Sequence, residues 1–595
     1  MFQSFEETAR PDQGPARLEA LRAELAREGL DGFIVPRADA HQGEYVAPHD
    51  ERLAWLTGFT GSAGYCVALT DRAGVFVDGR YRVQVKAQVA DVFTPVDWPE
   101  TGLAAWIAEA LPGGGRVGVD PWLFSVDQMR RLREGLDGVE VVACENLVDR
   151  IWADQPAPPM GTVRAHPPEF AGEAHEDKIA RLAGGLGPAE ACVLTLPDSI
   201  AWLLNIRGSD IPRNPVPHGF ALLNRDGSVE LFMAREKLAE LGDHLGSRVS
   251  VLPPEGFVAA LATLGGPVQI DPASCPVAVL DSLDRAEVIE AEDPCLLPKA
   301  CKNDAELEGS RAAHLRDAAA MVRFLAWVDA QAPGDFSEID VVRRLEAERA
   351  ASNMLRDISF ETIAGSGPHG AIVHYRVTES TDRKVQAGEL LLVDSGGQYA
   401  DGTTDITRTM AVGDPELVDE ETRAAFTRVL KGMVALSRLR WPEGLAGRDI
   451  DVLARAALWE AGLDYGHGTG HGVGAYLSVH EGPQRIARTG TVPLRPGMIV
   501  SNEPGFYREG AYGIRIENLI AVSEAPALPG QTVARMLCFE TLTWVPIDRR
   551  LILPSLLSEP ERRWIDDYHA RVLERVAPLL EPQDRAWLEA ACAPL

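Results

Sequence analysis

Hydrophobic and polar positions follow two different periods along the first 150 residues of the chain. Residues 16–28 place leucine and alanine at helical spacing, and Gly29 follows as a residue that ends a helix. Short apolar runs at 32–36, 64–70 and 73–78 are bounded by glycine and aspartate, and each predicts a buried strand. This mixture of helices and buried strands indicates a first α/β domain.

The same rhythm returns after a proline-rich stretch at residues 151–170, which is typical of a linker. A helical pattern at 176–186 precedes apolar runs at 191–196, 219–224 and 228–233. Two successive α/β domains of similar size and element order suggest a duplication, although no residue-level repeat is visible.

A third region begins with a long amphipathic helix predicted from residue 303. Asn303 can cap this helix together with Glu306, three residues later. Its apolar stripe is formed by Leu307, Leu315, Val322 and Leu325. Every chemically suggestive motif of the chain lies after this point.

The last segment, residues 558–580, is helical and amphipathic. Trp564 and Tyr568 on this segment are candidates for a subunit contact. The alternative is a helix that caps its own domain, and the pattern leaves both interpretations open.

Composition narrows the classes of protein that fit. A chain of 595 residues is too long for one core, and 46% apolar with 25% charged residues is typical of soluble globular proteins. The net charge of −30 disfavours nucleic acid and anionic membranes, because both attract Lys and Arg. Eight scattered cysteines without a CxxC pair indicate reduced thiols. The N-terminus lacks the apolar segment of a signal peptide, and no run approaches about 18 apolar residues, so we expect a cytoplasmic protein without membrane spans.

Two aspartates form the first part of a candidate metal site. Asp394 and Asp405 stand in "LLVDSGGQYADGTTDITRT", where two β-rich runs flank a glycine-containing turn. If they face each other across a hairpin that turns at Tyr399 and Ala400, their Cβ atoms lie about 4.5–5.5 Å apart. Carboxylates at that distance repel, and a cation between them relieves the repulsion. The alternative is a pair of solvated aspartates in a loop.

Three further motifs supply oxygen and nitrogen donors. His471 lies among alternating glycines, which make a helix of the HExxH type improbable and imply a close approach of chain to ligand. Glu503 precedes Pro504, which favours an extended backbone there. Glu517 alternates with apolar residues and shares a strand face with Arg515, so it either binds a metal or pairs with Arg515 on a solvated face.

The charges of these side chains match those of two divalent cations. Asp394, Asp405, Glu503 and Glu517 carry four negative charges, and His471 is neutral as a ligand. Two hard divalent cations restore neutrality and generate a hydroxide at neutral pH. The pattern therefore predicts a hydrolase.

In order and context, these five residues resemble the metal ligands of the creatinase/prolidase/methionine aminopeptidase superfamily. The surrounding sequence is still more similar to that of the three-domain cytosolic Xaa-Pro aminopeptidases, the aminopeptidase P family. The similar segments are "FTGSAG", "VDGRY", "AWLLNIRGSDIPRNPV", "HGTGHGVGAYLSVHEGP", "YGIRIEN" and "WVPIDRRLI". The resemblance thus covers nearly the whole chain.

The resemblance implies an α/β (α+β) protein with a pita-bread catalytic domain. It places creatinase-like α/β domains at residues 1–152 and 153–302 and the pita-bread metallopeptidase domain at 303–535. Residues 536–595 are expected to form a C-terminal extension packed on the catalytic domain.

The implied activity is hydrolysis of the bond between an N-terminal residue and a following proline. By resemblance, Asp394 binds one metal, Asp405 and Glu517 bridge both, and His471 with Glu503 completes the other site. A hydroxide shared by the metals would attack the peptide carbonyl. Peptides that begin with Xaa-Pro are therefore the expected partners.

The remaining roles are also carried over by resemblance. Glu503 is expected to move a proton from the attacking water to the leaving nitrogen. His374 and His480 match family histidines that hold the peptide and steady the oxyanion. His467 is expected to line the proline pocket.

Three more residues are predicted to bind substrate or support the metal shell. They are Tyr507 and Arg515 near the predicted ligands and Arg80 in the first domain. For Arg80 the alternative is an ion pair with Asp78.

Other interpretations remain open. Prolidase, which is restricted to dipeptides, shares all five ligands. The two auxiliary domains and the "GTGHGVG" motif nevertheless favour aminopeptidase P. Methionine aminopeptidase usually lacks such N-terminal domains. A non-catalytic pita-bread binding module predicts substitutions among the five ligands, and none is present.

Metal identity and assembly follow only from the resemblance. The donor set accepts Mn²⁺, Co²⁺ or Zn²⁺, and zinc would bind most tightly of the three. The resemblance nevertheless implies manganese. It also implies a homodimer formed through the catalytic domain.

Overall fold

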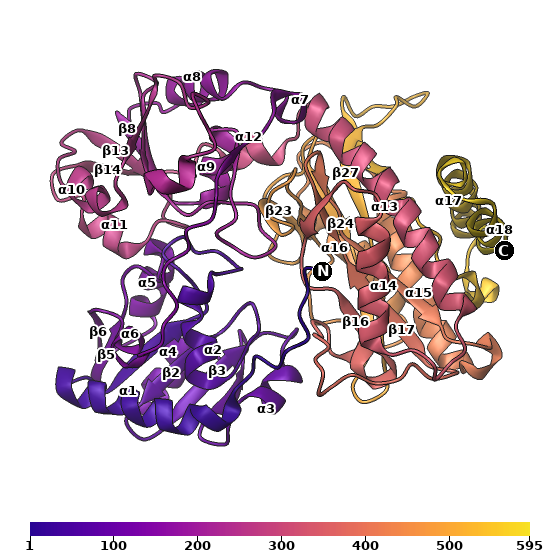
Figure 1. Cartoon of the computed structure of the whole chain (residues 1–595), viewed down its shortest axis with the longest axis horizontal. Coiled ribbons are helices and arrows are strands. Elements are labelled where there is room, and N and C mark those ends of the chain that lie inside the picture. Colours follow the sequence, from indigo (N-terminus) through magenta and orange to yellow (C-terminus); the bar gives the residue numbers. More distant parts are fainter. The chain divides into compact units, whose positions relative to one another are not determined.

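The computed structural model describes residues 1–595 and divides into two compact units. One unit is Thr8–Leu296, and the other combines Met1–Glu7 with Leu297–Leu595. Helices and strands are mixed in both units (Figure 1), which confirms the predicted class. The exact domain boundaries expected from the sequence stay a prediction.

The first half of Thr8–Leu296 is built around a six-stranded sheet in the order β4-β3-β2-β1-β5-β6. Its strands are β1 (Gly32–Pro36), β2 (Tyr65–Leu69), β3 (Ala73–Val77), β4 (Thr94–Asp97), β5 (Gly115–Val119) and β6 (Val139–Ala143). Its helices are α1 (Gly14–Glu28), α2 (Arg52–Thr57), α3 (Gln84–Gln88), α4 (Leu103–Ala110), α5 (Val126–Glu134) and α6 (Leu147–Ile151). As predicted, α1 ends at Gly29, which adopts the left-handed conformation with φ 64° that glycine tolerates.

The second half repeats this topology. Its sheet has the order β12-β11-β10-β8-β13-β14, and the parallel and antiparallel pairings recur in the same sequence as in the first sheet. The strands are β8 (Ala191–Leu194), β10 (Phe220–Asn224), β11 (Val229–Phe232), β12 (Val249–Leu252), β13 (Pro267–Ile270) and β14 (Glu287–Glu290), with β7 (Arg164–Ala165) and β9 (Ile206–Arg207) as a separate pair. The helices are α7 (Pro168–Ala171), α8 (His175–Gly184), α9 (Pro197–Leu203), α10 (Phe257–Leu261) and α11 (Val277–Asp281). Identical strand order and direction are what a duplication leaves behind.

After Met1–Glu7, the other unit resumes within α12 (Leu296–Ala300) and continues into the long helix α13 (Asp304–Ala330). Asn303 and Glu306 form the predicted capping box at the start of α13. Helix α13 packs against α14 (Glu338–Ala350), and α15 (Glu420–Ser437) packs against α16 (Gly447–Trp459). One continuous apolar core joins residues of α13, α14, α15 and the strands between them.

Antiparallel sheets position the candidate site residues in this unit. Strands β16 (Ile363–Ser366), β17 (Leu390–Ser395) and β20 (Ile406–Ala411) form one of them. A six-stranded sheet has the order β21-β28-β27-β24-β22-β23, made of β21 (Arg440–Pro442), β22 (Gly470–Gly472), β23 (Glu481–Ile486), β24 (Ile499–Asn502), β27 (Asn518–Glu524) and β28 (Met536–Thr541). The smaller pieces are β15 (Leu355–Ile358), β18 (Gly397–Tyr399), β19 (Gly402–Thr403), β25 (Gly505–Arg508) and β26 (Tyr512–Arg515).

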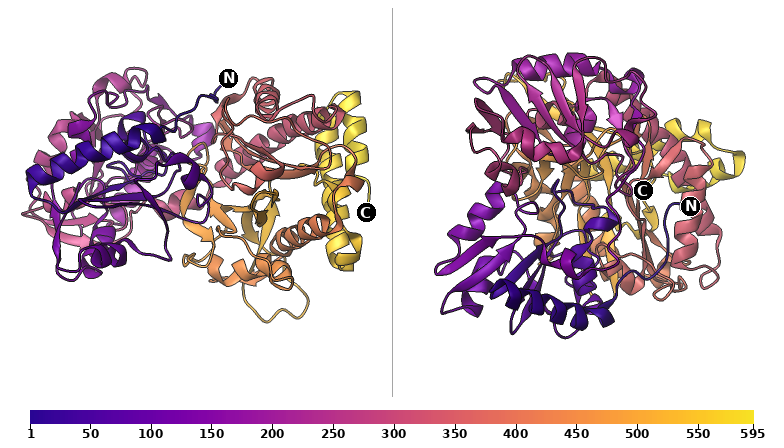
Figure 2. Two further views of the ribbon diagram at one scale, coloured as in Figure 1. Left: turned by 90° about the horizontal axis from the view of Figure 1, so that it is seen from below. Right: turned by 60° about the vertical axis from the view of Figure 1, so that its left-hand side comes forward.

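The C-terminal helices α17 (Glu559–Val576) and α18 (Pro582–Ala591) lie on the surface of this same unit (Figure 2). Tyr568 of α17 is only 3% exposed, and its hydroxyl donates a hydrogen bond to the carbonyl of Val545 at 2.8 Å. Trp564 stacks on Tyr568 with ring centroids 5.2 Å apart. Of the two interpretations of these aromatic residues, the structure therefore shows the helix that covers its own unit.

Two general features complete the description. All eight cysteines carry free thiols. No helix combines the length and the apolar character that crossing a lipid bilayer requires.

Candidate metal centre

Asp394 and Asp405 do not face each other as predicted. Asp394 pairs with Thr407 in β17 and β20, and the hairpin between them turns at Ala400 and Asp401 instead of Tyr399 and Ala400. Two contacts with α13 explain this register. A Cβ atom at Gly402 would lie 3.1 Å from the Ser310 Cα, a tight contact that favours glycine beside the helix, and Asp401 forms an ion pair with Arg316 at 2.6 Å.

The register error does not separate the two aspartates. The pairing is displaced by two residues, and an even displacement keeps a side chain on the same face of the sheet. Asp405 is therefore the diagonal neighbour of Asp394 on the face that bears the site. Both side chains are buried.

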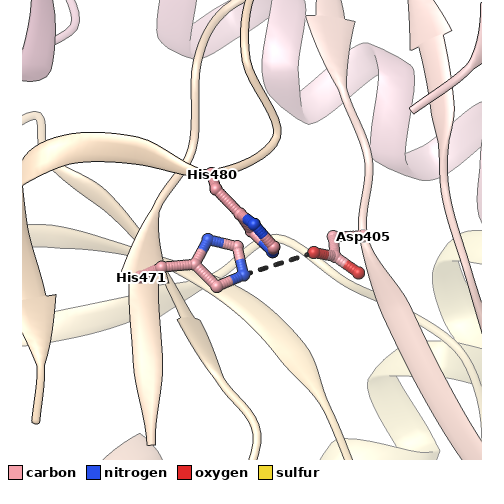
Figure 3. Close-up of side chains that lie close together, drawn as sticks. All are labelled: Asp405, His471 and His480. Atoms are coloured by element: carbon pink, nitrogen blue, oxygen red, sulfur yellow. Dashed lines mark ion pairs between the residues drawn. The ribbon is translucent and has the colours of Figure 1, made fainter. Parts of the chain in front are cut away.

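The predicted ligands converge in three overlapping groups, in each of which the ligand atoms lie within 4.8 Å of one another. The groups are Asp394–Asp405–Glu517, His471–Glu503–Glu517 and Asp405–His471–His480. The last is drawn in Figure 3, where the two imidazoles and the carboxylate point toward one another from different segments of the chain. His471 Nε2 lies 3.4 Å from Asp405 Oδ2 and 3.5 Å from Glu503 Oε1.

Glu517 reaches the cluster because a predicted strand is interrupted. Alternation suggested one strand from Tyr512 onward, but the structure has β26 in one sheet and β27 in another, with Ile516 and Glu517 between them. The Glu517 N–H donates a hydrogen bond to the Thr407 carbonyl at 3.1 Å, and the Thr407 hydroxyl donates one to Glu517 Oε2 at 2.7 Å. This break turns Glu517 toward β20.

The glycines around His471 serve chain packing. A Cβ atom at Gly470 would lie 2.0 Å from the Ser501 carbonyl oxygen, and one at Gly472 would lie 2.2 Å from the Glu481 carbonyl oxygen. These glycines allow β22 to pass between its neighbouring strands. The structure thus shows a close approach of chain to chain at these glycines, and the approach of chain to ligand stays a prediction.

Hydrogen bonds orient the His471 ring. Its Nδ1 lies 2.9 Å from the Gly472 carbonyl, so this nitrogen carries the proton and Nε2 faces the cluster. The Ser501 hydroxyl accepts from the His471 N–H at 2.9 Å and donates to Glu503 Oε1 at 3.1 Å. One serine therefore positions two of the predicted ligands.

Burial and mutual repulsion shift the pKa values of the side chains in the cluster. Burial is the main cause that raises the pKa of Asp394 to about 6, with Arg515 opposing the shift and Asp405 adding to it. Burial and the charges of Asp405 and Glu503 raise the pKa of Glu517 well above its ordinary value. Burial alone would lower the pKa of His471, but its hydrogen bond with Asp405 and the charge of Glu503 raise it to about 9.

Arg515, Tyr507 and His467 form a hydrogen-bonded chain that leads away from the cluster. Arg515 donates to Asp394 Oδ2 at 2.6 Å and to the Tyr507 hydroxyl at 2.7 Å. The Tyr507 hydroxyl lies 2.9 Å from His467 Nε2. Arg515 is 1% exposed, so the alternative of an Arg515–Glu517 pair on a solvated face is wrong.

Thr407 and Ser501 are site residues that the sequence interpretation missed. Thr407 joins Glu517 to Arg515, whose Nε donates to the threonine hydroxyl at 3.1 Å. A usable signal existed, because Thr407 lies two residues after Asp405 and Ser501 two residues before Glu503. In an extended chain such positions share a face.

The remaining predicted residues lie as follows. His480 is part of the cluster, with its ring centroid 4.2 Å from that of His471. His374 is half-buried, three residues beyond the short helix η5 (Gly367–Ala371). Arg80 lines a cavity of about 380 Å³ within Thr8–Leu296 and pairs with Asp78 at 2.7 Å, which is the ion pair considered as the alternative.

The donor set fits a pair of divalent cations. Asp394 Oδ1 and Glu517 Oε1 are buried and accept no hydrogen bond from the protein, although buried carboxylate oxygens normally have partners. Four carboxylates and one imidazole are donors that hard and borderline divalent metals accept. Cations would supply both the missing partners and the missing positive charge.

Models of known families match almost the whole chain. Metallopeptidase family M24 matches residues 308–524, and the C-terminal region of peptidase_M24 matches residues 535–595. Two models described as Creatinase/Prolidase N-terminal domain match residues 17–151 and 154–306.

Individual relatives match over most of their length. Aminopeptidase P2 of Arabidopsis thaliana is 40% identical over 601 residues, covering 93% of this chain and 84% of that protein. The X-prolyl aminopeptidase of Caenorhabditis elegans, described as a cytosolic enzyme with a di-nuclear active site, is 34% identical with a TM-score of 0.91, and the match covers 98% of this chain and 100% of that one. Dipeptidase PepE of Mycobacterium ulcerans is 26% identical with a TM-score of 0.50, covering 62% of this chain and 95% of that one.

Proposed function

The chain belongs to metallopeptidase family M24, and we propose that it is a metal-dependent Xaa-Pro aminopeptidase. Such an enzyme releases the first residue of a peptide whose second residue is proline. Proline offers no amide N–H and has a fixed φ, so peptidases that need this donor fail there. A site that acts on the carbonyl alone has no such requirement.

One observation carries the proposal. Four carboxylates and two imidazoles from separate segments of the chain converge in one cluster, and two of the carboxylate oxygens are buried without a hydrogen bond. This arrangement is costly without cations, so it is a poor candidate for a purely structural feature. It also argues against a non-catalytic binding module, which has no need of an intact ligand set.

We propose that Asp394, Asp405, His471, Glu503 and Glu517 hold two divalent cations, in line with the di-nuclear active site described for the C. elegans enzyme. Bound there, the cations would polarise the peptide carbonyl and lower the pKa of a water molecule. Manganese is our proposed metal, with cobalt and zinc as the alternatives.

The protein's own groups would then position the peptide and transfer the proton. Glu503 Oε1 lies 3.5 Å from His471 Nε2 and is our proposed carrier of a proton from the attacking water to the prolyl nitrogen. His480, beside His471, and His374 would donate hydrogen bonds to the peptide and to the oxyanion as it forms. Burial lowers the pKa of His467 to about 4, so it would present a neutral ring to the proline side chain.

Arg515 and Tyr507 would act mainly on the shell around the cations. Arg515 holds Asp394 in its ionised form, and Tyr507 holds Arg515. For Arg80 we propose a contact with substrate, as in the family pattern, in exchange for its ion pair with Asp78.

Prolidase is the second candidate. Dipeptidase PepE matches 62% of this chain, whereas the relatives named as Xaa-Pro aminopeptidases match both N-terminal domains as well. The full-length match favours the aminopeptidase. We further propose a cytoplasmic location and a homodimer, in keeping with the resemblance.

A paired assay on the purified protein tests the proposal. Release of the first residue is measured from Xaa-Pro-Yaa and Xaa-Ala-Yaa tripeptides and from an Xaa-Pro dipeptide, before and after chelation and with Mn²⁺ added back. We expect cleavage of the Xaa-Pro tripeptide alone or in preference, its loss on chelation and its return with metal. Cleavage of the dipeptide only would identify a prolidase, and activity indifferent to chelators would refute the dinuclear site.

A further inference from the structure

The first seven residues belong to the catalytic unit, although the chain continues from Thr8 into the other unit. Residues 2–7, called the strap below, show alternating burial, with Gln3 3% and Phe5 7% exposed. Phe2, Ser4 and Glu6 are exposed. The strap thus lies on the catalytic unit with one face inward.

Two inward side chains anchor the strap. Gln3 makes a reciprocal pair with Thr362, because its Oε1 accepts from the Thr362 N–H at 2.8 Å and its Nε2 donates to the Thr362 carbonyl at 3.3 Å. Phe5 enters the apolar core of the unit, with the Arg343 guanidinium 5.3 Å from its ring centre.

The backbone of the strap holds a second segment. Arg376 donates to the carbonyls of Ser4 and Glu6 at 3.0 and 2.9 Å. The Glu379 N–H donates to the Phe5 carbonyl at 2.8 Å. These contacts fix residues that directly follow His374.

The segment that the strap holds has no regular secondary structure. Residues 372–389, between η5 and β17, contain no helix and no strand. Tyr375 gives one inner anchor, since its hydroxyl donates to Glu338 at 3.0 Å. His374 precedes Tyr375, so the contacts made by Tyr375 and Arg376 constrain the backbone beside it.

The strap also contacts the residue that precedes β16. Thr362, which Gln3 holds, immediately precedes Ile363, and Ile363 pairs with Asp394 across β16 and β17. One short stretch of chain therefore contacts the start of the strand beside a proposed ligand and the segment that carries a proposed substrate-binding histidine.

We propose that the strap positions His374 for the substrate, with Gln3 and Phe5 as positioning residues that never touch the peptide themselves. The proposal rests on the proposed function, because His374 acts there on the substrate. Loss of the strap leaves the five ligands in place but frees the segment around His374. Productive binding of the peptide then becomes weaker, since small misplacements of a binding group lower the rate strongly.

The test is a double-mutant cycle with Phe5→Ala and His374→Ala on the full-length, metal-loaded protein. Phe5→Ala is expected to lower kcat/KM for an Xaa-Pro-Yaa tripeptide by about 10-fold or more, mainly through KM. In the His374→Ala background the same change should have little further effect. Phe5→Leu should restore most of the activity, and Phe2→Ala, an exposed phenylalanine of the same strap, should match the wild type.

Hydrogen exchange supplies a readout independent of activity. Phe5→Ala should speed exchange of the amides between Ile372 and Thr381, while metal content and the exchange of β17 stay as in the wild type. Equal losses of activity in both backgrounds, or unchanged exchange in that segment, would overturn the strap's role. A wild-type protein that leaves the tripeptide uncut would instead refute the proposed function, and the exchange experiment would still decide whether the strap orders the segment.

Discussion

Arg515 donates a hydrogen bond to Asp394 at 2.6 Å, and both side chains are buried. The same guanidinium contacts Tyr507 and Thr407, so its three nitrogens serve three different partners. A buried carboxylate beside other carboxylates resists ionisation, and Arg515 opposes that tendency at Asp394. The pair therefore favours the ionised form of Asp394, in which this proposed ligand can bind a cation.

Arg515→Lys should weaken metal binding. A lysine ammonium cannot reproduce the planar arrangement of donors that joins Asp394, Tyr507 and Thr407. We expect metal affinity to fall by about 10- to 100-fold, as for other supports of metal ligands. Titration of the metal-free protein with Mn²⁺ measures this, and Arg508→Lys, at an exposed arginine paired with Glu421, is the matched control. Equal affinities of the wild type and Arg515→Lys would contradict the role of Arg515.

Asp405→Asn should stop turnover and stabilise the metal-free protein. The substitution removes one charge from a group of repelling carboxylates and also a predicted bridge between the cations. We expect the free energy of unfolding without metal to rise by roughly 0.5–2 kcal/mol, the range of single stabilising substitutions. The peptidase assay tests the loss of turnover. Thermal midpoints with chelator and with Mn²⁺ test the change in stability, because the wild type should gain more from metal than the variant. The exposed Glu416→Gln is the control; a fall in stability of the metal-free Asp405→Asn protein would count against a repelling cluster.

Glu481→Gln should destabilise the catalytic unit strongly. Glu481 lies between Lys302 at 2.5 Å and Lys299 at 2.9 Å, and all three side chains are at most 1% exposed. Removing the carboxylate leaves two buried ammonium groups without a counter-charge, which costs about 3–5 kcal/mol. Denaturant unfolding measures the loss. Glu524→Gln, which breaks an exposed pair with Arg535, should cost at most about 1 kcal/mol, and a similar loss in both variants would refute the argument.

We expect the protein to lose stability in acid because of His569. It is fully buried, its Nε2 accepts a hydrogen bond from the Ile547 N–H at 3.1 Å, and burial lowers its pKa to about 4. Between the ordinary histidine pKa of about 6.5 and this value, the unfolded chain binds the proton and the folded chain does not. Stability therefore falls as the pH drops through that window, by up to roughly 3 kcal/mol from this group.

His569→Gln, which keeps an acceptor but cannot titrate, should flatten the pH dependence of the thermal midpoint between about pH 6.5 and 4. The half-exposed His49→Gln serves as the control. An unchanged slope in His569→Gln would show that other groups account for the acid sensitivity.

Local sequence patterns predicted most of the regular elements. The strands at 32–36, 64–70 and 73–78 and the capping box of Asn303 and Glu306 appear where the patterns placed them. These features depend on neighbouring residues, namely apolar alternation, glycine boundaries and a reciprocal cap. Such signals are complete within a short stretch of chain.

The hairpin of Asp394 and Asp405 shows where local signals stop. Its turn position depends on Gly402 beside Ser310 and on Asp401 beside Arg316, and both contacts join residues distant in sequence. The break after Arg515 likewise depends on two separate sheets that take up β26 and β27. The residues that flank the hairpin and the break reveal neither of these long-range effects.

By itself, the sequence determined the family to which the chain belongs and predicted the side chains that gather in the cluster, because both depend on residue types and their order along the chain. Tertiary structure alone decided the register of the hairpin, the buried partners of Arg515 and the docking of residues 2–7 on the catalytic unit. Those features arise from contacts between distant segments, whose energies depend on three-dimensional packing and on shared burial.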